Sequence, residues 1–202
     1  MLLLADIGGY TSFLRSVEEA HRDDAFAGGA VPPAYSMVSS LLDGIIASVV
    51  PPFTLSKLEG DAVFAWAPDA DLPRGTALLA CLGACYAAFR QRLGGAHQVW
   101  TCRCEACARV DALDLKFILH AGPFVIQPFA GRTELVGPEV VMAHRLLKTG
   151  AGMLAGGAYA LITEAAARRF AVPIEGSLPI VETYEHYPPV HAHVFPLATA
   201  AG

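Results

Sequence analysis

The chain of 202 residues lacks asparagine altogether and has only three lysines, Lys57, Lys116 and Lys148. Any site that needs an asparagine amide is therefore excluded. Basic residues never form a cluster longer than two, and the formal net charge is −5, so we expect neither nucleic acid nor an anionic membrane surface as a partner. An uninterrupted apolar run of about 20 residues, the length that spans a bilayer, is also missing.

The cysteines are unlike those of a secreted disulfide protein. There are five, an odd number, and Cys102, Cys104 and Cys107 fall within six residues. The first residues show no basic stretch followed by a cleavage site, so we expect no signal peptide and a cytoplasmic location. Because 54% of the residues are hydrophobic, we expect part of the apolar surface to be covered by a second copy of the chain.

The order of apolar segments predicts an α+β fold. Residues 2–7 are predicted to form a fully buried strand, Thr11 can cap the helix that follows, and a second helix begins after Pro32-Pro33. A hairpin, a long helix over 75–93 and further strands complete a ferredoxin-like βαββαβ core, one sheet with helices on one face. Extra strands are expected at 179–184 and 190–195. We expect a single domain over 1–202, with a Cys-containing insertion at about 95–113.

Two carboxylates mark strand ends in this arrangement. Asp6 ends the first strand and Asp61 lies in the turn of the neighbouring hairpin, so they can meet at one edge. With the backbone of Ile7 they form an oxygen site suited to Mg²⁺ or Mn²⁺. Gly8 and Gly9 leave N–H groups open at a helix start, where phosphate binds favourably. The alternative is that Asp6 caps the helix and Asp61 only fills a turn.

Four segments carry a family resemblance: ADIGGYTSFL, KLEGDAVFAW, ILHAGP and VGPEVVMAHRLL. Their order and approximate spacing resemble those of the class III nucleotidyl cyclase catalytic domain over residues 2 to 165. The chain is also similar to a divergent bacterial branch of this superfamily, of unknown function, with a Cys-x-Cys-x-x-Cys segment. The resemblance implies a cyclase-domain fold, a homodimer and a bound purine nucleotide. An active member would convert ATP to cyclic AMP and pyrophosphate.

The resemblance also implies roles for single residues. Asp6 and Asp61 match the metal ligands, Lys57 and Glu134 match the purine-reading residues, and Arg145 matches the arginine that stabilises the transition state. In the family, the metal ligands come from one subunit and the other residues from its partner, so only a dimer holds a complete site.

Two departures from the family pattern weaken the case for turnover. Val141 stands at the position of the transition-state asparagine, and no lysine follows Lys148 to grip the triphosphate. Losing one preorganised donor costs on the order of 10²–10³ in rate, so efficient cyclisation is not expected. His144 is an alternative donor. The alternative function is a non-catalytic homodimeric signalling or interaction module with a structural metal in the Cys loop.

The Cys loop forms a second candidate site. Cys102, Cys104 and Cys107 can reach one tetrahedral ion, and His97, five residues upstream of Cys102, is the simplest fourth ligand for Zn²⁺. An iron–sulfur centre, redox-active thiols and free thiols stay open as alternatives.

Overall fold

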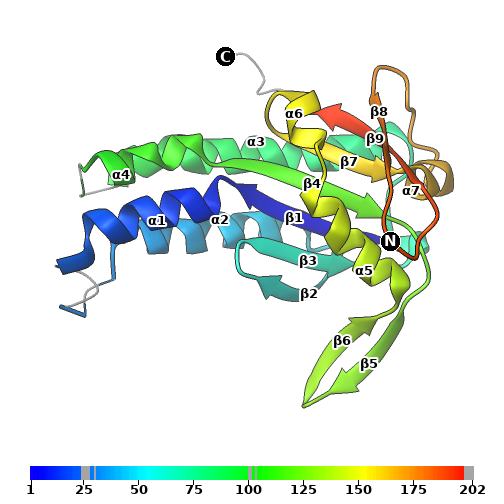
Figure 1. Ribbon diagram of the computed structural model, residues 1–202, viewed down its shortest axis with the longest axis horizontal. Coiled ribbons are helices and arrows are strands. Elements are labelled where there is room, and N and C mark those ends of the chain that lie inside the picture. The colour runs from blue at the N-terminus through cyan, green and yellow to red at the C-terminus, as the bar shows by residue number, and fades with distance from the viewer. Residues whose placement is uncertain (24–27, 30, 100–101, 103, 198–202) are drawn as a thin grey trace.

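The computed structural model describes residues 1–23, 28–29, 31–99, 102 and 104–197, without the side chains of residues 96–99. These residues form a seven-stranded sheet of order β2-β3-β1-β4-β7-β9-β8 and a separate hairpin of β5 and β6 (Figure 1). The strands are β1 (Leu2–Gly8), β2 (Thr54–Glu59), β3 (Ala62–Trp66), β4 (Asp114–His120), β5 (Val125–Phe129), β6 (Arg132–Val136), β7 (Tyr159–Thr163), β8 (Leu178–Glu182) and β9 (Val190–Pro196).

The sheet has the predicted core. β1 lies between β3 and β4 and is antiparallel to both, and β2 pairs with β3 at the edge. β7 runs parallel to β4, and β9 and β8 extend the sheet as antiparallel strands. The βαββαβ core and the additional C-terminal strands are therefore confirmed.

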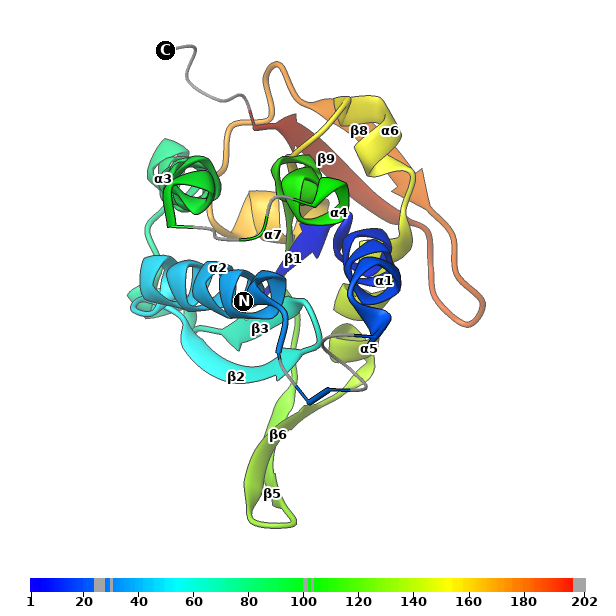
Figure 2. The same ribbon diagram turned by 90° about the vertical axis from the view of Figure 1, so that its left-hand side faces the viewer.

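Helices cover both faces of the sheet. One face carries the core helices, with α2 and α3 side by side (Figure 2). Its helices are α1 (Tyr10–Ala20), α2 (Pro33–Val49), α3 (Thr76–Val99), α4 (Glu105–Ala108) and α7 (Glu164–Arg169). The other face carries α5 (Pro138–Arg145) and α6 (Ala151–Ala155). Short 3₁₀ turns lie at Asp69–Asp71, Arg109–Ala112 and Leu146–Lys148. The prediction that the helices lie on one face of the sheet is thus correct for the core helices, but α5 and α6 cover the other face.

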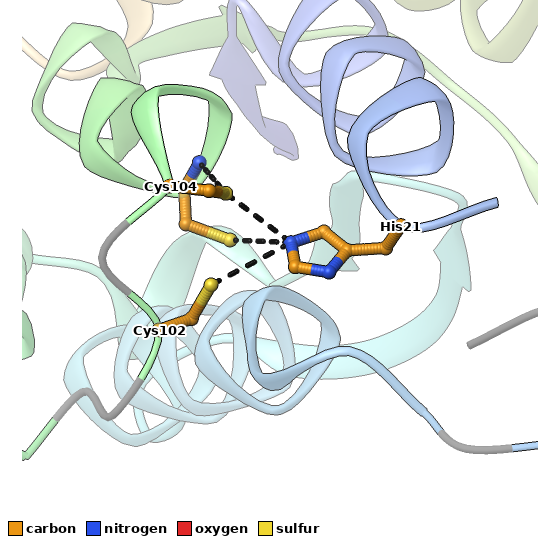
Figure 3. Close-up of side chains that lie close together, drawn as sticks. His21, Cys102 and Cys104 are labelled. Atoms are coloured by element: carbon orange, nitrogen blue, oxygen red, sulfur yellow. Dashed lines mark hydrogen bonds between the residues drawn. The ribbon is translucent and has the colours of Figure 1, made fainter. Parts of the chain in front are cut away.

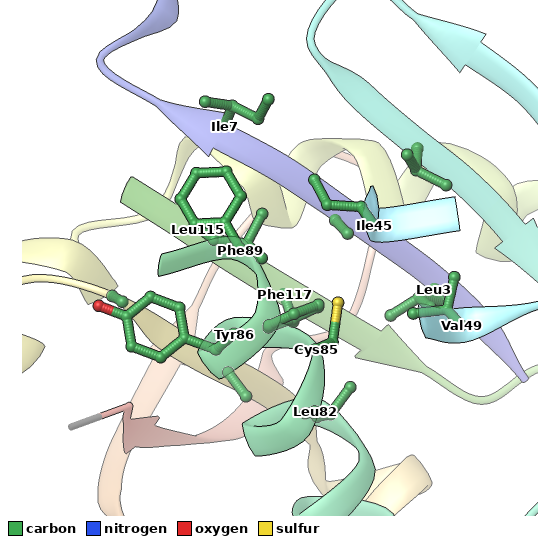
Figure 4. Close-up of a cluster of buried hydrophobic side chains, with 14 of the residues drawn as sticks. Leu3, Ile7, Ile45, Val49, Leu82, Cys85, Tyr86, Phe89, Leu115 and Phe117 are labelled. Atoms are coloured by element: carbon green, nitrogen blue, oxygen red, sulfur yellow. The ribbon is translucent and has the colours of Figure 1, made fainter. Parts of the chain in front are cut away.

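The residues of β1 explain why both faces need cover. Leu3 and Ile7 belong to the hydrophobic cluster under α1, α2 and α3, whereas Leu2 and Leu4 belong to the cluster under α5 and α6. Figure 4 shows Leu3 and Ile7 of the first cluster together with Val49 of α2. Successive side chains of a strand point to opposite faces, so a strand with apolar residues on both faces must be buried on both.

The turn from β1 into α1 differs from the expectation. The helix begins at Tyr10 and its N-cap is Gly9, at φ 81°, so the prediction that Thr11 caps it is wrong. Gly9 is required there because a Cβ would also lie 3.3 Å from the carbonyl oxygen of Ala112. The close approach joins the start of α1 to the segment that precedes β4.

The hairpin of β5 and β6 projects from the body of the molecule (Figure 1). It exposes large apolar side chains, among them Val125 at 59% and Phe129 at 67%. The sequence analysis did not find β6, because Arg132–Val136 carries polar residues and has little apolar periodicity.

The single domain over 1–202 stays a prediction. The expected insertion at about 95–113 contains the end of α3, then α4 and a 3₁₀ turn. Within the part of the chain that the structure describes, no helix combines the length and apolarity needed to cross a membrane.

Candidate functional site

Two aspartates lie at the end of the sheet where β1 leads into α1. Asp6 pairs with Ala62 of β3, and the N–H of Ile7 donates to the carbonyl oxygen of Asp61 at 3.2 Å. Burial and then the charge of Asp6 raise the pKa of the Asp61 carboxyl. Such mutual repulsion is relieved by a shared cation. Asp6, Asp61 and the Ile7 backbone therefore stay the predicted oxygen donor set for a divalent ion.

Lys116 is a residue at this site that the sequence analysis missed. It lies opposite Asp6 in the pairing of β1 with β4, and its Nζ is 2.9 Å from Asp6 Oδ2. The same ammonium donates to the carbonyl oxygen of Leu147 at 3.3 Å. A lone lysine in the apolar run LDLKFILH is the signal that could have found it, because a charge on a buried strand needs a partner.

A cavity of about 450 Å³ opens beside Lys116. Gly8, Gly9, Thr149 and Tyr159 form part of its wall. Burial raises the pKa of the Tyr159 hydroxyl, although Lys116 nearby opposes the effect. The glycine turn expected to receive phosphate therefore faces a space of the size that small ligands occupy.

Lys57 and Glu134 meet at a second point of the surface. Lys57 Nζ lies 2.8 Å from Glu134 Oε2, and Glu59 Oε1 is 3.4 Å from the same ammonium. The hydrogen bond to Glu134, followed by the attraction of Glu59, raises the pKa of Lys57 against the effect of burial. Lys57 comes from β2 and Glu134 from β6, so the fold joins two residues 77 positions apart.

His144 on α5 belongs to this second group. Its Nε2 lies 2.7 Å from Glu59 Oε2, and its Nδ1 lies 2.7 Å from the carbonyl oxygen of Val140. The ring also meets Phe64 edge-on, with centroids 4.8 Å apart. As an alternative donor, His144 is therefore held beside Glu59 and the Lys57–Glu134 pair.

Arg145, by contrast, is held by the connection between β8 and β9. Its guanidinium lies 5.0 Å from the ring centroid of Tyr187 and 5.7 Å from that of Tyr184, and Nη1 donates to the carbonyl oxygen of Glu185 at 3.2 Å. Val141, one turn earlier on α5, is 46% exposed. Stacking over aromatic rings holds a cation at a defined place, so Arg145 links α5 to the connection between β8 and β9.

The cysteines of the insertion converge on a histidine that the sequence analysis did not name. Nε2 of His21 lies 3.2 Å from Cys104 Sγ, 3.4 Å from Cys107 Sγ and 3.6 Å from Cys102 Sγ (Figure 3). The four ligand atoms all lie within 4.8 Å of one another, so the group could hold a metal ion. The side chain of His97, the expected fourth ligand, lies outside the described residues.

The thiols of this cluster differ in acidity. Burial disfavours the thiolate of Cys104, but hydrogen bonds from Cys107, Cys102 and His21 outweigh burial and lower its pKa to about 7. Burial and the neighbouring thiols raise the pKa of Cys107. Cys104 therefore ionises more readily than Cys107.

Solved structures similar to this chain include several cyclases. The adenylyl cyclase CyaB from P. aeruginosa matches with a TM-score of 0.56 and 14% identity, covering 100% of this chain and 95% of that one. A bacterial light-regulated adenylyl cyclase gives 0.59 and 12%, covering 94% and 50%. The guanylyl cyclase Cya2 gives 0.51 and 15%, covering 98% and 92%. At these identities the likeness shows the fold alone, and it confirms the resemblance to class III cyclase domains.

A family model described as "Protein of unknown function (DUF2652)" matches residues 38–152. A curated relative, "Uncharacterized protein Rv2561/Rv2562" of Mycobacterium tuberculosis (strain ATCC 25618 / H37Rv), is 34% identical over 113 residues, which is 55% of this chain and 51% of the relative. The chain thus matches about half the length of that relative.

Proposed function

Because the chain belongs to the DUF2652 family and has the fold of class III cyclase catalytic domains, we propose that it binds a purine nucleoside triphosphate with Mg²⁺ or Mn²⁺. The observation that carries the proposal is the 2.8 Å contact between Lys57 and Glu134. The family resemblance assigns purine reading to both positions, and the fold brings them together from separate strands.

The chemistry of the Lys57–Glu134 pair suits a purine edge. An ammonium donates and a carboxylate accepts, which matches a ring nitrogen acceptor beside the amino donor of adenine. Guanine offers the complementary set through its carbonyl oxygen and ring N–H. When no base is bound, the ion pair between the two side chains neutralises both charges and holds both groups in position.

The other end of the nucleotide has matching groups. Asp6, Asp61 and Ile7 form the oxygen set for the divalent ion, and Gly8 and Gly9 open onto the neighbouring cavity. A metal ion bound there supplies positive charge to the phosphates. The residues of this chain would hold the ion and leave room beside Gly8 and Gly9 for the phosphates.

Turnover is expected to be weak. Val141 offers no hydrogen bond where the family has asparagine, and Arg145 is engaged by Tyr184 and Tyr187. Each lost donor costs on the order of 10²–10³ in rate, so conversion of ATP to cyclic AMP and pyrophosphate would be slow or absent.

The binding proposal is tested by titrating the purified chain with ATP, GTP and CTP in the presence of Mn²⁺, using calorimetry. We expect the purines to bind more tightly than CTP, and Lys57→Ala to weaken purine binding on the order of tenfold or more. Lys148→Ala, which removes an exposed lysine, is the matched control and should change nothing. Equal affinity for CTP, or no effect of Lys57→Ala, would contradict the proposal.

Turnover is measured separately, by mass spectrometry of the products formed from ATP or GTP with Mn²⁺. Cyclic nucleotide that disappears in Asp6→Ala would show a working cyclase without the asparagine. Binding without any product would fit the weak turnover expected here.

The proposal includes a homodimer formed through the β5–β6 hairpin. A two-stranded ribbon that exposes Val125 and Phe129 is marginally stable alone and gains from an apolar partner. A second copy is the partner that also completes the site in the family. We expect light scattering to give twice 21.3 kDa, and Phe129→Asp to weaken the dimer on the order of tenfold. Val31→Asp, at another exposed apolar residue, should leave the mass unchanged.

A second candidate function is a non-catalytic signalling or interaction module in which Zn²⁺ holds the Cys loop. The convergence of His21 with three thiols favours it. It predicts a dimer that keeps the fold but shows neither purine preference nor product in the two assays above.

A further inference from the structure

The geometry points to a closed four-ligand zinc site made by His21, Cys102, Cys104 and Cys107, which fastens the end of α1 to the Cys loop. It deepens the second candidate function, on whose metal-holding Cys loop it rests, and it does not depend on nucleotide binding. The four ligands come from two segments more than 80 positions apart.

Hydrogen bonding alone does not account for the convergence. A histidine Nε2 either donates one hydrogen or accepts through one lone pair, yet three sulfur atoms lie 3.2–3.6 Å from this nitrogen. In a tetrahedral zinc site, with Zn–S about 2.3 Å and Zn–N about 2.0 Å, nitrogen and sulfur ligands lie about 3.5 Å apart. The observed spacing therefore suits four ligands around one central ion.

The hydrogen bonding around Cys104 supports the same reading. Its Sγ accepts the backbone N–H of Cys107 at 3.3 Å, and it caps the four-residue helix α4. N–H groups directed at a ligating sulfur stabilise its thiolate and fix its orientation. The Cys-x-x-Cys half of the cluster is thus arranged as a chelating turn, with Cys102 and His21 closing the other side.

The ligand set distinguishes zinc from the alternatives left open by the sequence. Three sulfurs and one imidazole are a standard closed set for structural Zn²⁺. An iron–sulfur cluster would normally take four thiolates and would hold them farther apart than one ion does. All three thiols are free of disulfide bonds. Four protein ligands leave no open position, so the ion serves structure.

The ion would join the end of α1 to the Cys loop, two segments that also share apolar packing. His21 is the C-cap residue of α1, and Phe13 and Val17 of that helix share a hydrophobic cluster with Val110 and Leu113, which follow the cysteines. The apolar contacts join the middle of α1 to the insertion, and the ion joins its end. The short α4 alone would be too small to fix the loop.

The first measurement is the metal content of the full chain, followed by cobalt substitution. We expect one zinc per chain, and a cobalt form with the strong visible absorption of tetrahedral coordination and thiolate-to-cobalt charge transfer. A folded chain that binds neither ion, or that carries a disulfide among the three cysteines, would overturn the inference.

Variants then test the ligand set. His21→Ala and Cys104→Ser should weaken zinc binding at least on the order of 100-fold, whereas Cys81→Ser and His186→Ala, both at exposed residues, should keep one zinc. His21→Cys preserves four ligands, so it should retain zinc and strengthen the charge-transfer band even if the alanine variant folds poorly. Full zinc content with an unchanged cobalt spectrum in His21→Ala would overturn the role of His21, and His97→Ala would then be the variant to measure.

The same samples separate this inference from the nucleotide proposal. Purine binding that persists in the zinc-free His21→Ala chain would leave both claims standing as independent sites. Zinc binding without purine preference would support the inference and refute the first candidate function.

Discussion

The two ends of α1 present two sites of opposite chemistry. At its start lie Asp6 and Asp61, and Lys116, the ion-pair partner of Asp6, lines a cavity of about 450 Å³. At its end, His21 meets three thiols, and together they make up a set of four ligands. Eleven residues of helix, about 16 Å, lie between them. Open oxygen sites suit ions that exchange with a ligand, whereas closed sulfur sites suit ions that stay.

The largest effect is expected from removing the ion at the thiol end. Dialysis against a strong zinc chelator should lower Tm by about 10 °C, corresponding to about 3 kcal/mol in a chain of this size. Differential scanning calorimetry measures the change, and Zn²⁺ should restore it while Mg²⁺ should not. Recovery with Mg²⁺ alone would place the stabilising ion at the carboxylate end and break the comparison.

A smaller loss is expected from Asp6→Asn at the other end. Asp6 and Lys116 are largely buried, with side chains 15% and 26% exposed, so the substitution leaves an ammonium without its counter-charge. Stability should fall by about 1–2 kcal/mol, and the Tm shift caused by Mn²⁺ should vanish. Urea unfolding measures the first effect.

The matched control for that experiment is the double variant Asp6→Asn/Lys116→Met. It removes both charges, so it should regain more than half of the lost stability while remaining insensitive to Mn²⁺. No difference between the single and double variants would mean that the pair contributes nothing to folding.

The smallest effect is expected from Asp61→Asn, and it has the opposite sign. Burial and Asp6 raise the pKa of the Asp61 carboxyl in the native state above its ordinary value of 3.8. At pH values between 3.8 and this raised pKa, the native state therefore binds more protons than the unfolded state. Stability therefore falls as pH rises through this window, and the cost persists at neutral pH. The amide should gain less than 1 kcal/mol, because solvent screens a half-exposed carboxylate.

Urea unfolding at several pH values, without divalent ions, measures this gain. The pH dependence above 3.8 should flatten in Asp61→Asn. Equal destabilisation by Asp6→Asn and Asp61→Asn would show that the ion pair with Lys116 does not make Asp6 more important for stability than Asp61.

The sequence predicted the parts of the fold that depend on local apolar pattern. β1, β3 and the long helices follow from runs and stripes of apolar residues, and the meeting of Asp6 with the hairpin follows from the strand order. The pairing of Lys57 with Glu134 required the family resemblance, because no spacing relates residues 77 positions apart.

Contacts between distant polar segments could not be predicted in the same way. His21 lies in a polar stretch that reads as the end of a helix, and only the folded chain brings it to the thiols. Lys116 became a partner of Asp6 through the register of β1 with β4, which sequence pattern alone does not fix. The cap at Gly9 depended on the close carbonyl of Ala112.

The connection between β8 and β9 also holds both ends of α5. The hydroxyl of Tyr187 donates to the carbonyl of Pro138 at the start of this helix, and that of Tyr184 donates to Arg145 at its end. A helix of eight residues bracketed at both termini cannot fray without releasing the connection between β8 and β9. Amide hydrogen exchange in α5 should therefore follow that of the last two strands as one cooperative unit.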